Sequence, residues 1–330
     1  MIHFFNLQKK IENIRVYITV IFLMSTIQTR PKLLFSTQSY LPLYNKLLPL
    51  GNFEAGNLKR REFADGEHYM QIQSNIKERD VVVLGGTVSD SDTLEIYDLA
   101  CGLVDAGAHR MWIIIPYYGY STMERAVKPG EVVKAKTRAR LLSSIPVPGS
   151  GAQVVMLDLH VDSIAWYFEG NIRPHHLIGR KLLLDMIRSI VTEKDFVLAS
   201  TDAGRAKQVQ SLANDLGVLP SFIFKKRLDS GETEVSAVSA QVKDKQVIIY
   251  DDMIRTGGSL IGAAQAYKDA GATSISVVTT HGIFAQDALV KLRSCGLIDK
   301  IVVTDSHPNA INSDFVTVFS IAKLLSDFLE

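Results

Sequence analysis

The chain has 330 residues, of which 47% are hydrophobic and 22% are charged, as is usual for a globular protein. It is about twice as long as a typical domain, so we expect two domains of roughly 150 residues. Lys and Arg together number 36 against 35 Asp and Glu, which gives a formal charge of +1 and no basic block that would suit a nucleic-acid backbone. Nucleic acid is therefore not an expected partner.

The two cysteines, Cys101 and Cys295, provide neither a disulfide framework nor a metal-thiolate cluster. Such sparse use of cysteine fits a reducing compartment. We expect a cytoplasmic protein.

Residues 1–30 are treated as an extension outside the fold. An apolar run from Val16 to Met24 follows Arg15 and looks like part of a signal sequence. The run is well short of the roughly 20 apolar residues that span a bilayer, and no small-residue cleavage site precedes Arg30-Pro31. We favour an upstream extension, with Met24 as a candidate start, over an export signal, and we expect no membrane association.

From Asp80 onward, short runs rich in β-branched residues alternate with helical patterns. Continuous apolar strands joined through helices indicate a mainly parallel sheet covered on both faces, which is α/β architecture. The expected strands, in chain order, cover residues 81–86, 111–119, 153–160, 195–200, 246–252, 275–282 and 301–306.

The two halves of the chain resemble each other. A strand, a helix and the segment Asp-Ala-Gly-Ala occur twice in the same order, and this segment begins at Asp105 and again at Asp269, about half a chain length later. Glycine between a helix and a strand is also ordinary βαβ punctuation, so the likeness has a local explanation as well. We favour a duplication, with similar domains at residues 31–175 and 176–330, a boundary near 171–178, and a last helix able to pack on the N-terminal domain.

Polar and glycine residues follow the strand expected at 246–252. Asp251 and Asp252 end the apolar run, and residues 256–259, Thr-Gly-Gly-Ser, lead into a helical pattern. Ligands of open α/β sheets bind beyond the carboxyl ends of the strands, and a glycine loop at a helix N-terminus can surround a phosphate. The carboxylates would repel that phosphate, so they suit sugar hydroxyls or a metal. A helix cap and a plain turn are the structural alternatives, whereas a sugar phosphate would satisfy both parts of the segment.

The segment VIIYDDMIRTGGSL, residues 247–260, resembles the phosphoribosyl-diphosphate loop of proteins with the type I phosphoribosyltransferase fold. Six further segments resemble, in order, those of the ribose-phosphate diphosphokinase family, also called phosphoribosyl-diphosphate synthetases, and the likeness covers residues 33–328. They are Phe63-Ala64-Asp65-Gly66-Glu67, Asp158-Leu159-His160, Ser200-Thr201-Asp202-Ala203-Gly204, Phe224-Lys225-Lys226-Arg227, Thr280-His281-Gly282 and Val303-Thr304-Asp305.

This resemblance implies two phosphoribosyltransferase-type domains and an enzyme that transfers the diphosphoryl group of ATP to the C1 hydroxyl of ribose 5-phosphate. Lys225 and Arg227 would be the catalytic cations, and Mg²⁺ would be the cofactor that bridges phosphate oxygens. Of the two implied metal ligands, Asp202 is chemically more suitable than His160, because Mg²⁺ prefers oxygen. The remaining implied roles are ATP binding by Phe63, Asp65, Glu67 and His160, and ribose 5-phosphate binding by Asp202, Asp251, Asp252, Thr256, Gly257, Gly258 and Ser259.

The sequence departs from the family pattern at two places near the implied ATP site. The family usually carries Arg and Gln where this chain has Thr122 and Met123, and neither side chain supplies a guanidinium or an amide. ATP would have to be held in another way, with Arg125 or Lys128 as candidate substitutes.

Two further departures lie in the implied sugar-phosphate site. Arg255 stands where the family commonly has Asp, and an arginine there would favour a nearby phosphate. Arg205 follows Gly204, where the family usually has a second glycine.

Two other functions remain open. A non-catalytic regulatory paralogue would explain Thr122 and Met123, whereas a phosphoribosyltransferase would need only one such domain and a hood. Family members are dimers arranged as hexamers, so the resemblance also implies a homo-oligomer with active sites at its interfaces.

Overall fold

The computed structural model describes residues 30–192, 195–227, 233–238 and 242–330. Within residues 224–227 and 233–237 only the backbone is described. In this part of the chain no helix is long and apolar enough to cross a membrane.

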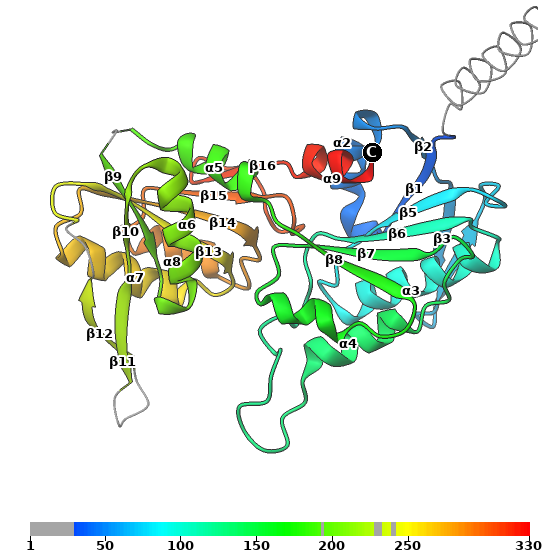
Figure 1. Ribbon diagram of the computed structural model, residues 1–330, viewed down its shortest axis with the longest axis horizontal. Coiled ribbons are helices and arrows are strands. Elements are labelled where there is room, and N and C mark those ends of the chain that lie inside the picture. Colours follow the sequence, from blue (N-terminus) through cyan, green and yellow to red (C-terminus); the bar gives the residue numbers. More distant parts are fainter. Residues whose placement is uncertain (1–29, 193–194, 228–232, 239–241) are drawn as a thin grey trace, which may run out of the picture.

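Two six-stranded sheets form the centres of the two halves, and all neighbouring strands within each sheet are parallel. This confirms the expected α/β class (Figure 1). The first sheet has the order β2 (Phe53–Ala55), β1 (Lys32–Ser36), β5 (Asp80–Leu84), β6 (Arg110–Ile115), β7 (Ala152–Leu157), β8 (Ile172–Leu177). The second has the order β10 (Leu219–Ser221), β9 (Phe196–Ser200), β13 (Gln246–Ile254), β14 (Ser274–Gly282), β15 (Lys300–Thr304), β16 (Val316–Phe319).

The strand order is the same in both halves. Each half also carries an antiparallel hairpin between its second and third sheet strands, formed by β3 (Leu58–Glu62) with β4 (His68–Ile72) and by β11 (Ile223–Arg227) with β12 (Thr233–Val238). The two Asp-Ala-Gly-Ala segments end corresponding helices, and Gly107 and Gly271 have φ values of +89° and +95°. Glycine adopts this left-handed conformation without steric cost, so both segments close a helix in the same way.

Helices cover both faces of each sheet. Successive strand residues point to opposite sides, so a continuous apolar strand makes both faces apolar, and both must be covered. In β5, Val81 and Val83 lie in one core cluster, whereas Val82 and Leu84 lie in another on the other side of the sheet. In the first half α3 (Asp90–Asp105) and α4 (Lys134–Ser143) cover one face, and α2 (Leu41–Leu47) covers the other with α9 (Ala322–Leu329). In the second half α7 (Gly258–Asp269) and α8 (Ala288–Ser294) face α5 (Arg180–Arg188) and α6 (Ala206–Leu216) across the sheet. Short 3-10 helices cover Gln38–Tyr40, Leu48–Leu50, Asp162–Tyr167 and Ala203–Arg205.

The last helix, α9, packs on the first half although it follows the second sheet in sequence. Leu325 and Leu329 are buried in the core cluster that contains Leu34 and Tyr40. The Ser326 hydroxyl donates a hydrogen bond of 3.1 Å to the backbone oxygen of Leu50. Figure 1 shows α9, in red, beside α2. The chain crosses from the first half to the second between β8 and α5, and it returns to the first half between β16 and α9. Two separate connections therefore join the halves.

Candidate functional site

A cavity of about 610 Å³ lies where the two halves meet. It brings together most of the polar residues that the sequence singled out. Its lining comprises Thr122, Glu124, Arg125, His160 and Val161 from the first half, and residues 201, 202, 204, 205 and 251–260 from the second.

The glycine loop that joins β13 to α7 forms one part of the cavity wall. Gly257 has φ +80°, and a Cβ at this position would lie 2.9 Å from Cγ of Leu292, so only glycine fits without displacing a core side chain. None of the described side chains caps α7, and the next residues, Gly258 and Ser259, are exposed at the cavity. The first N–H groups of α7, together with the Thr256 and Ser259 hydroxyls, can therefore bind an anion such as a phosphate.

Asp251 and Asp252 lie near the carboxyl end of β13 and face the cavity. Burial and the charge of Asp252 raise the pKa of Asp251 to about 7. Burial acts in the same direction on Asp252, but a hydrogen bond with His160 and the positive charge of Arg205 outweigh it, so the pKa of Asp252 is lowered. The Thr201 hydroxyl donates to Oδ2 of Asp251 at 2.8 Å and helps to fix this carboxylate.

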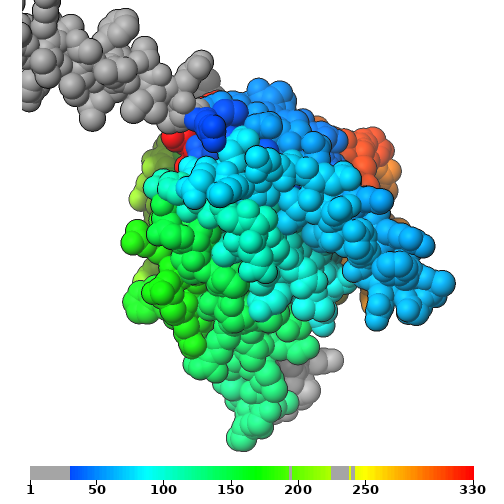
Figure 2. Space-filling model, turned by 90° about the vertical axis from the view of Figure 1, so that its right-hand side faces the viewer, coloured from blue at the N-terminus to red at the C-terminus, as the bar shows by residue number. Residues whose placement is uncertain are grey.

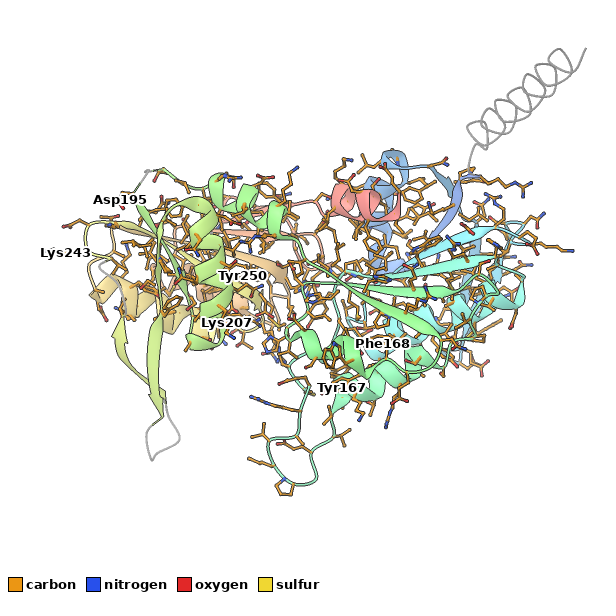
Figure 3. The ribbon with its side chains drawn as sticks, viewed as in Figure 1. Tyr167, Phe168, Asp195, Lys207, Lys243 and Tyr250 are labelled. Atoms are coloured by element: carbon orange, nitrogen blue, oxygen red, sulfur yellow. The ribbon has the colours of Figure 1, made fainter. Side chains whose placement is uncertain are left out.

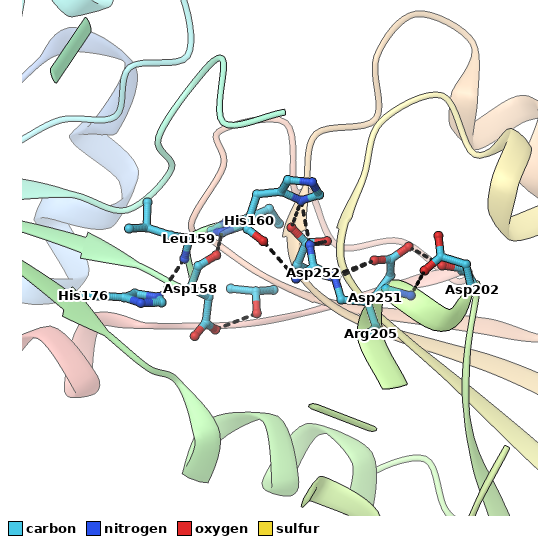
Figure 4. A network of polar contacts seen from close by, with 12 residues as sticks. Asp158, Leu159, His160, His176, Asp202, Arg205, Asp251 and Asp252 are labelled. Carbon is cyan, nitrogen blue, oxygen red and sulfur yellow. Dashed lines mark hydrogen bonds and ion pairs between the residues drawn. The ribbon is translucent and has the colours of Figure 1, made fainter. Parts of the chain in front are cut away.

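The Arg205 guanidinium lies against both carboxylates (Figure 4). Its Nη2 is 2.6 Å from Oδ1 of Asp252, and its Nε is 3.7 Å from Oδ1 of Asp251. Nη1 donates to the backbone oxygen of His160 at 3.0 Å, so the same side chain also joins the two halves. The sequence identified Arg205 only as a departure from the family pattern. Its contact with Asp251 and Asp252 could not be predicted, because it joins residues that are far apart in sequence.

His160 reaches the acidic pair from the loop after β7. Its Nδ1 lies 2.8 Å from Oδ2 of Asp252 and 2.6 Å from Nη2 of Arg205. The first contact needs a proton on Nδ1 and the second needs a lone pair there, so only one of the two forms a hydrogen bond in a given protonation state. All described contacts of the ring involve Nδ1, and Nε2 is left for a ligand.

Asp158 and Thr280 join two of the expected motifs across the halves. The buried Asp158 accepts hydrogen bonds from the Thr280 hydroxyl at 2.7 Å and from the Gly179 backbone N–H at 3.0 Å. His281 Nε2 lies 3.2 Å from the Asp158 backbone oxygen. Burial lowers the pKa of His281, so its ring is neutral and its Nε2 can donate to this oxygen. These contacts fix the loop that carries His160.

Asp202 also lines the cavity, at the end of β9. Its Oδ1 accepts a 2.8 Å hydrogen bond from the Gly204 N–H, which holds the carboxylate at the start of a 3-10 turn. No described residue forms an ion pair with Asp202, in contrast to Asp251 and Asp252, so its carboxylate is available to a cation or a hydroxyl.

Tyr167 and Phe168, labelled in Figure 3, contact residues of the segment 118–125, which follows β6. The Tyr167 hydroxyl donates to the backbone oxygen of Glu124 at 2.5 Å, and Phe168 packs edge-on against Tyr118. These contacts position the wall of the cavity that carries Thr122 and Glu124.

Two of the departures from the family pattern are in contact with each other. Nη1 of Arg255 donates to Oγ1 of Thr122 at 3.1 Å, although the residues belong to different halves. Arg255 therefore places a guanidinium beside the position where the family usually has its arginine. Met123 is exposed and does not line the cavity, and Arg125 pairs with Glu124 at 3.3 Å.

The Phe63, Asp65 and Glu67 side chains do not join this cavity. They lie at the exposed tip of the β3–β4 hairpin, where Phe63 packs against Tyr69 and beneath Arg61. Figure 2 shows this part of the chain as a projection at the right of the molecule.

The side chains of Lys225 and Arg227 lie outside the described residues. The backbone of both residues belongs to β11 of the second hairpin, where Lys225 is opposite Val235 and Arg227 is opposite Thr233. Their roles stay predictions from the sequence.

Comparison with known proteins identifies relatives that span nearly the whole fold. Residues 32–145 match the family profile of the N-terminal domain of ribose phosphate pyrophosphokinase, and residues 194–329 match that of the phosphoribosyl synthetase-associated domain. A ribose-phosphate pyrophosphokinase of Corynebacterium efficiens is 31% identical over 303 residues, covering 89% of this chain and 90% of the relative. One from Porphyromonas gingivalis is 29% identical over 276 residues, covering 83% and 86%.

A solved structure agrees with this assignment. The crystal structure of phosphoribosylpyrophosphate synthetase from Mycobacterium smegmatis matches with a TM-score of 0.79 and 28% identity, over 90% of this chain and 97% of that one. The match therefore spans both sheets. The chain belongs to the ribose-phosphate pyrophosphokinase family.

Proposed function

We propose that this chain transfers the diphosphoryl group of ATP to the C1 hydroxyl of ribose 5-phosphate, giving 5-phosphoribosyl 1-diphosphate and AMP. The observation that carries the proposal is the meeting of the glycine loop, the Asp251–Asp252 pair and His160 in one cavity. An anion site and a carboxylate pair in the same cavity match the two ends of a sugar phosphate. The 5-phosphate would bind at Thr256–Ser259, and the ring hydroxyls would bind at the carboxylates.

In this reaction the C1 oxygen attacks the β-phosphorus of ATP, the bond from that phosphorus to the α,β-bridging oxygen breaks, and AMP leaves. The C1 hydroxyl loses its proton to the surroundings. Such transfer depends mainly on positioning and on neutralising charge on the transferred group. We assign the neutralising role to Lys225 and Arg227 on the sequence pattern alone.

Mg²⁺ is the proposed cofactor, and the donors at the cavity fit it in part. Among the described residues no group of three or more His, Cys, Asp or Glu side chains is placed to hold a metal. Mg²⁺ commonly binds through one or two carboxylates while substrate phosphates and waters complete its shell, so Asp202 is a suitable ligand and His160 Nε2 a weaker one. When bound, the ion would neutralise charge on the ATP phosphates.

A homo-oligomer is proposed because the first hairpin lies away from the cavity. If Phe63, Asp65 and Glu67 help to bind adenine, one chain alone does not bring them to the residues that line its own cavity. A second copy would supply them. A cytoplasmic location is likewise proposed, from the sparse use of cysteine.

The proposal is tested by measuring AMP formation by the purified protein with ATP, Mg²⁺ and ribose 5-phosphate. AMP that depends on ribose 5-phosphate and is abolished by Lys225→Ala is expected. Ser259→Ala is a matched binding variant, which should raise the KM for ribose 5-phosphate while the secondary structure content remains unchanged. If no AMP forms with ATP or with any other nucleoside triphosphate, the proposal fails.

The second candidate is a non-catalytic regulatory paralogue. It is favoured by Thr122, which cannot supply the guanidinium that the family usually has there, and by Arg205, which already engages both carboxylates. A paralogue of this kind would bind nucleotide or a synthetase subunit without forming AMP. The same AMP assay distinguishes the two functions, because the paralogue alone would form no AMP. A mixture of this chain with an active synthetase is added to the assay, and a regulatory paralogue should change the rate at which that synthetase forms AMP.

A further inference from the structure

Arg205 contacts charged and polar groups from both halves of the molecule. Its guanidinium contacts Asp251, Asp252 and the backbone of His160 through three different nitrogens, and its side chain is only 15% exposed. The Gly204 backbone N–H donates to Oδ1 of Asp202 at 2.8 Å, and Asp202 and Arg205 both line the cavity. The arginine is therefore held at one place by both halves of the molecule.

The carboxylates that Arg205 contacts need a positive partner. Asp251 and Asp252 are adjacent in sequence and largely buried, with side chains 20% and 4% exposed. When both are ionised, two negative charges this close repel each other, and burial increases the repulsion because the local dielectric constant is low. A divalent cation or a guanidinium can balance them. Oδ2 of Asp251 accepts a hydrogen bond from Thr201, and Oδ2 of Asp252 lies 2.8 Å from Nδ1 of His160, so a cation at this pair would compete with Arg205 for the Oδ1 atoms.

We propose that Arg205 is a positioning residue that serves as the resident cation of the Asp251–Asp252 pair, so that this pair binds sugar hydroxyls without a divalent cation. Oδ1 of each acid faces the guanidinium, whereas Oδ2 of Asp251 is held by Thr201. Asp251 is the more exposed of the two acids and is the one that a hydroxyl from the cavity reaches. The sugar part of this inference rests on the proposed function; the cation part does not.

The cation role is tested without substrate, by titrating the protein with Mn²⁺ and following free Mn²⁺ by electron paramagnetic resonance. Arg205→Gly should gain one Mn²⁺ site that the wild-type protein lacks, or it should bind Mn²⁺ at least about tenfold more tightly than wild type. A tenfold gain in affinity corresponds to about 1.4 kcal/mol. The double variant Arg205→Gly/Asp251→Asn should lose this gain. Equal Mn²⁺ stoichiometry and affinity in wild type and Arg205→Gly would overturn the inference.

Two control variants separate charge from structure. Arg180 also pairs with an aspartate, Asp215, at 2.6 Å, but away from the cavity. Arg180→Gly should therefore create no comparable Mn²⁺ site. Arg205→Lys keeps a positive charge and should exclude Mn²⁺ as wild type does. Arg205→Gln removes the charge but retains a long side chain, so it should gain the Mn²⁺ site even if Arg205→Gly fails to fold.

The sugar role is tested by calorimetric titration with ribose 5-phosphate in EDTA and in Mg²⁺. Wild type should bind equally well in both, and Arg205→Gly should bind only in Mg²⁺. Wild-type binding that requires Mg²⁺ would overturn the sugar part of the inference while the proposed function stands. If no protein binds ribose 5-phosphate under either condition, the proposed function fails, and the Mn²⁺ comparison still decides the role of Arg205 as a cation.

Discussion

Two neighbouring threonines on β14 should respond in opposite ways to the same substitution. Thr280→Val removes the hydroxyl that donates to the Asp158 carboxylate across the two halves, at 2.7 Å. Thr279→Val removes a buried hydroxyl whose oxygen has no hydrogen-bond partner among the described residues. Valine has nearly the shape of threonine, so neither change creates a cavity.

The magnitudes follow from the partner of each hydroxyl. A hydrogen bond to a charged group contributes about 1.5–3 kcal/mol, so Thr280→Val should lower the free energy of unfolding by about that amount. Burying a hydroxyl without a partner costs about 1–3 kcal/mol, so Thr279→Val should be neutral or stabilising by up to that amount. Thr280→Ser keeps the hydroxyl and loses only one methyl group, which should cost about 1 kcal/mol.

Urea unfolding followed by two probes measures these effects. Both tryptophans, Trp112 and Trp166, belong to the first half, so their fluorescence reports on that half, whereas circular dichroism reports on both. The Thr280→Val transition should move to lower urea by both probes. If Thr279→Val destabilises the protein as much as Thr280→Val does, the assignment of the Asp158 hydrogen bond is wrong.

Three further predictions concern stability. Burial lowers the pKa of His307 from 6.5 to about 4, so between these pH values the unfolded state binds more protons than the folded state. The free energy of unfolding should therefore be highest above pH 6.5 and fall towards pH 4 by up to about 1.4 kcal/mol per pH unit, and His307→Gln should show a smaller slope. Leu325→Ala removes a 1% exposed side chain of α9 from the core of the first half and should cost about 2–5 kcal/mol in urea unfolding, whereas Val290→Ala, at a 69% exposed position, should cost almost nothing. Gly119→Ala would place a Cβ 2.0 Å from the backbone oxygen of Thr87 and should sharply reduce the melting temperature. Gly149→Ala, where a Cβ would have no atom within 4 Å apart from its chain neighbours, should leave it unchanged, and equal melting temperatures would contradict the reasoning.

The sequence predicted the features that depend on neighbouring residues. The continuous apolar run before Asp251 required a strand buried on both faces, and Gly257 marked the turn into α7. The edge strand β8 was not predicted, because Pro174 and half-buried residues hide its pattern; proline is tolerated there because only one side of an edge strand is paired. Strand β1, near the start of the described chain, was also missed, because it precedes the regular alternation of strands and helices that begins at Asp80.

The sequence by itself determined the α/β class, the repeat and the glycine loop, because strand periodicity, helix ends and backbone conformation are local properties of the chain. Only the tertiary structure decided that Arg205 lies against Asp251 and Asp252, that Arg255 donates a hydrogen bond to Thr122 and that Thr280 donates one to Asp158. Each of these contacts joins residues that are distant in sequence, and their positions depend on how the cores of the two halves pack. Local patterns specify the elements, whereas the charges that meet in the cavity depend on the packing between them.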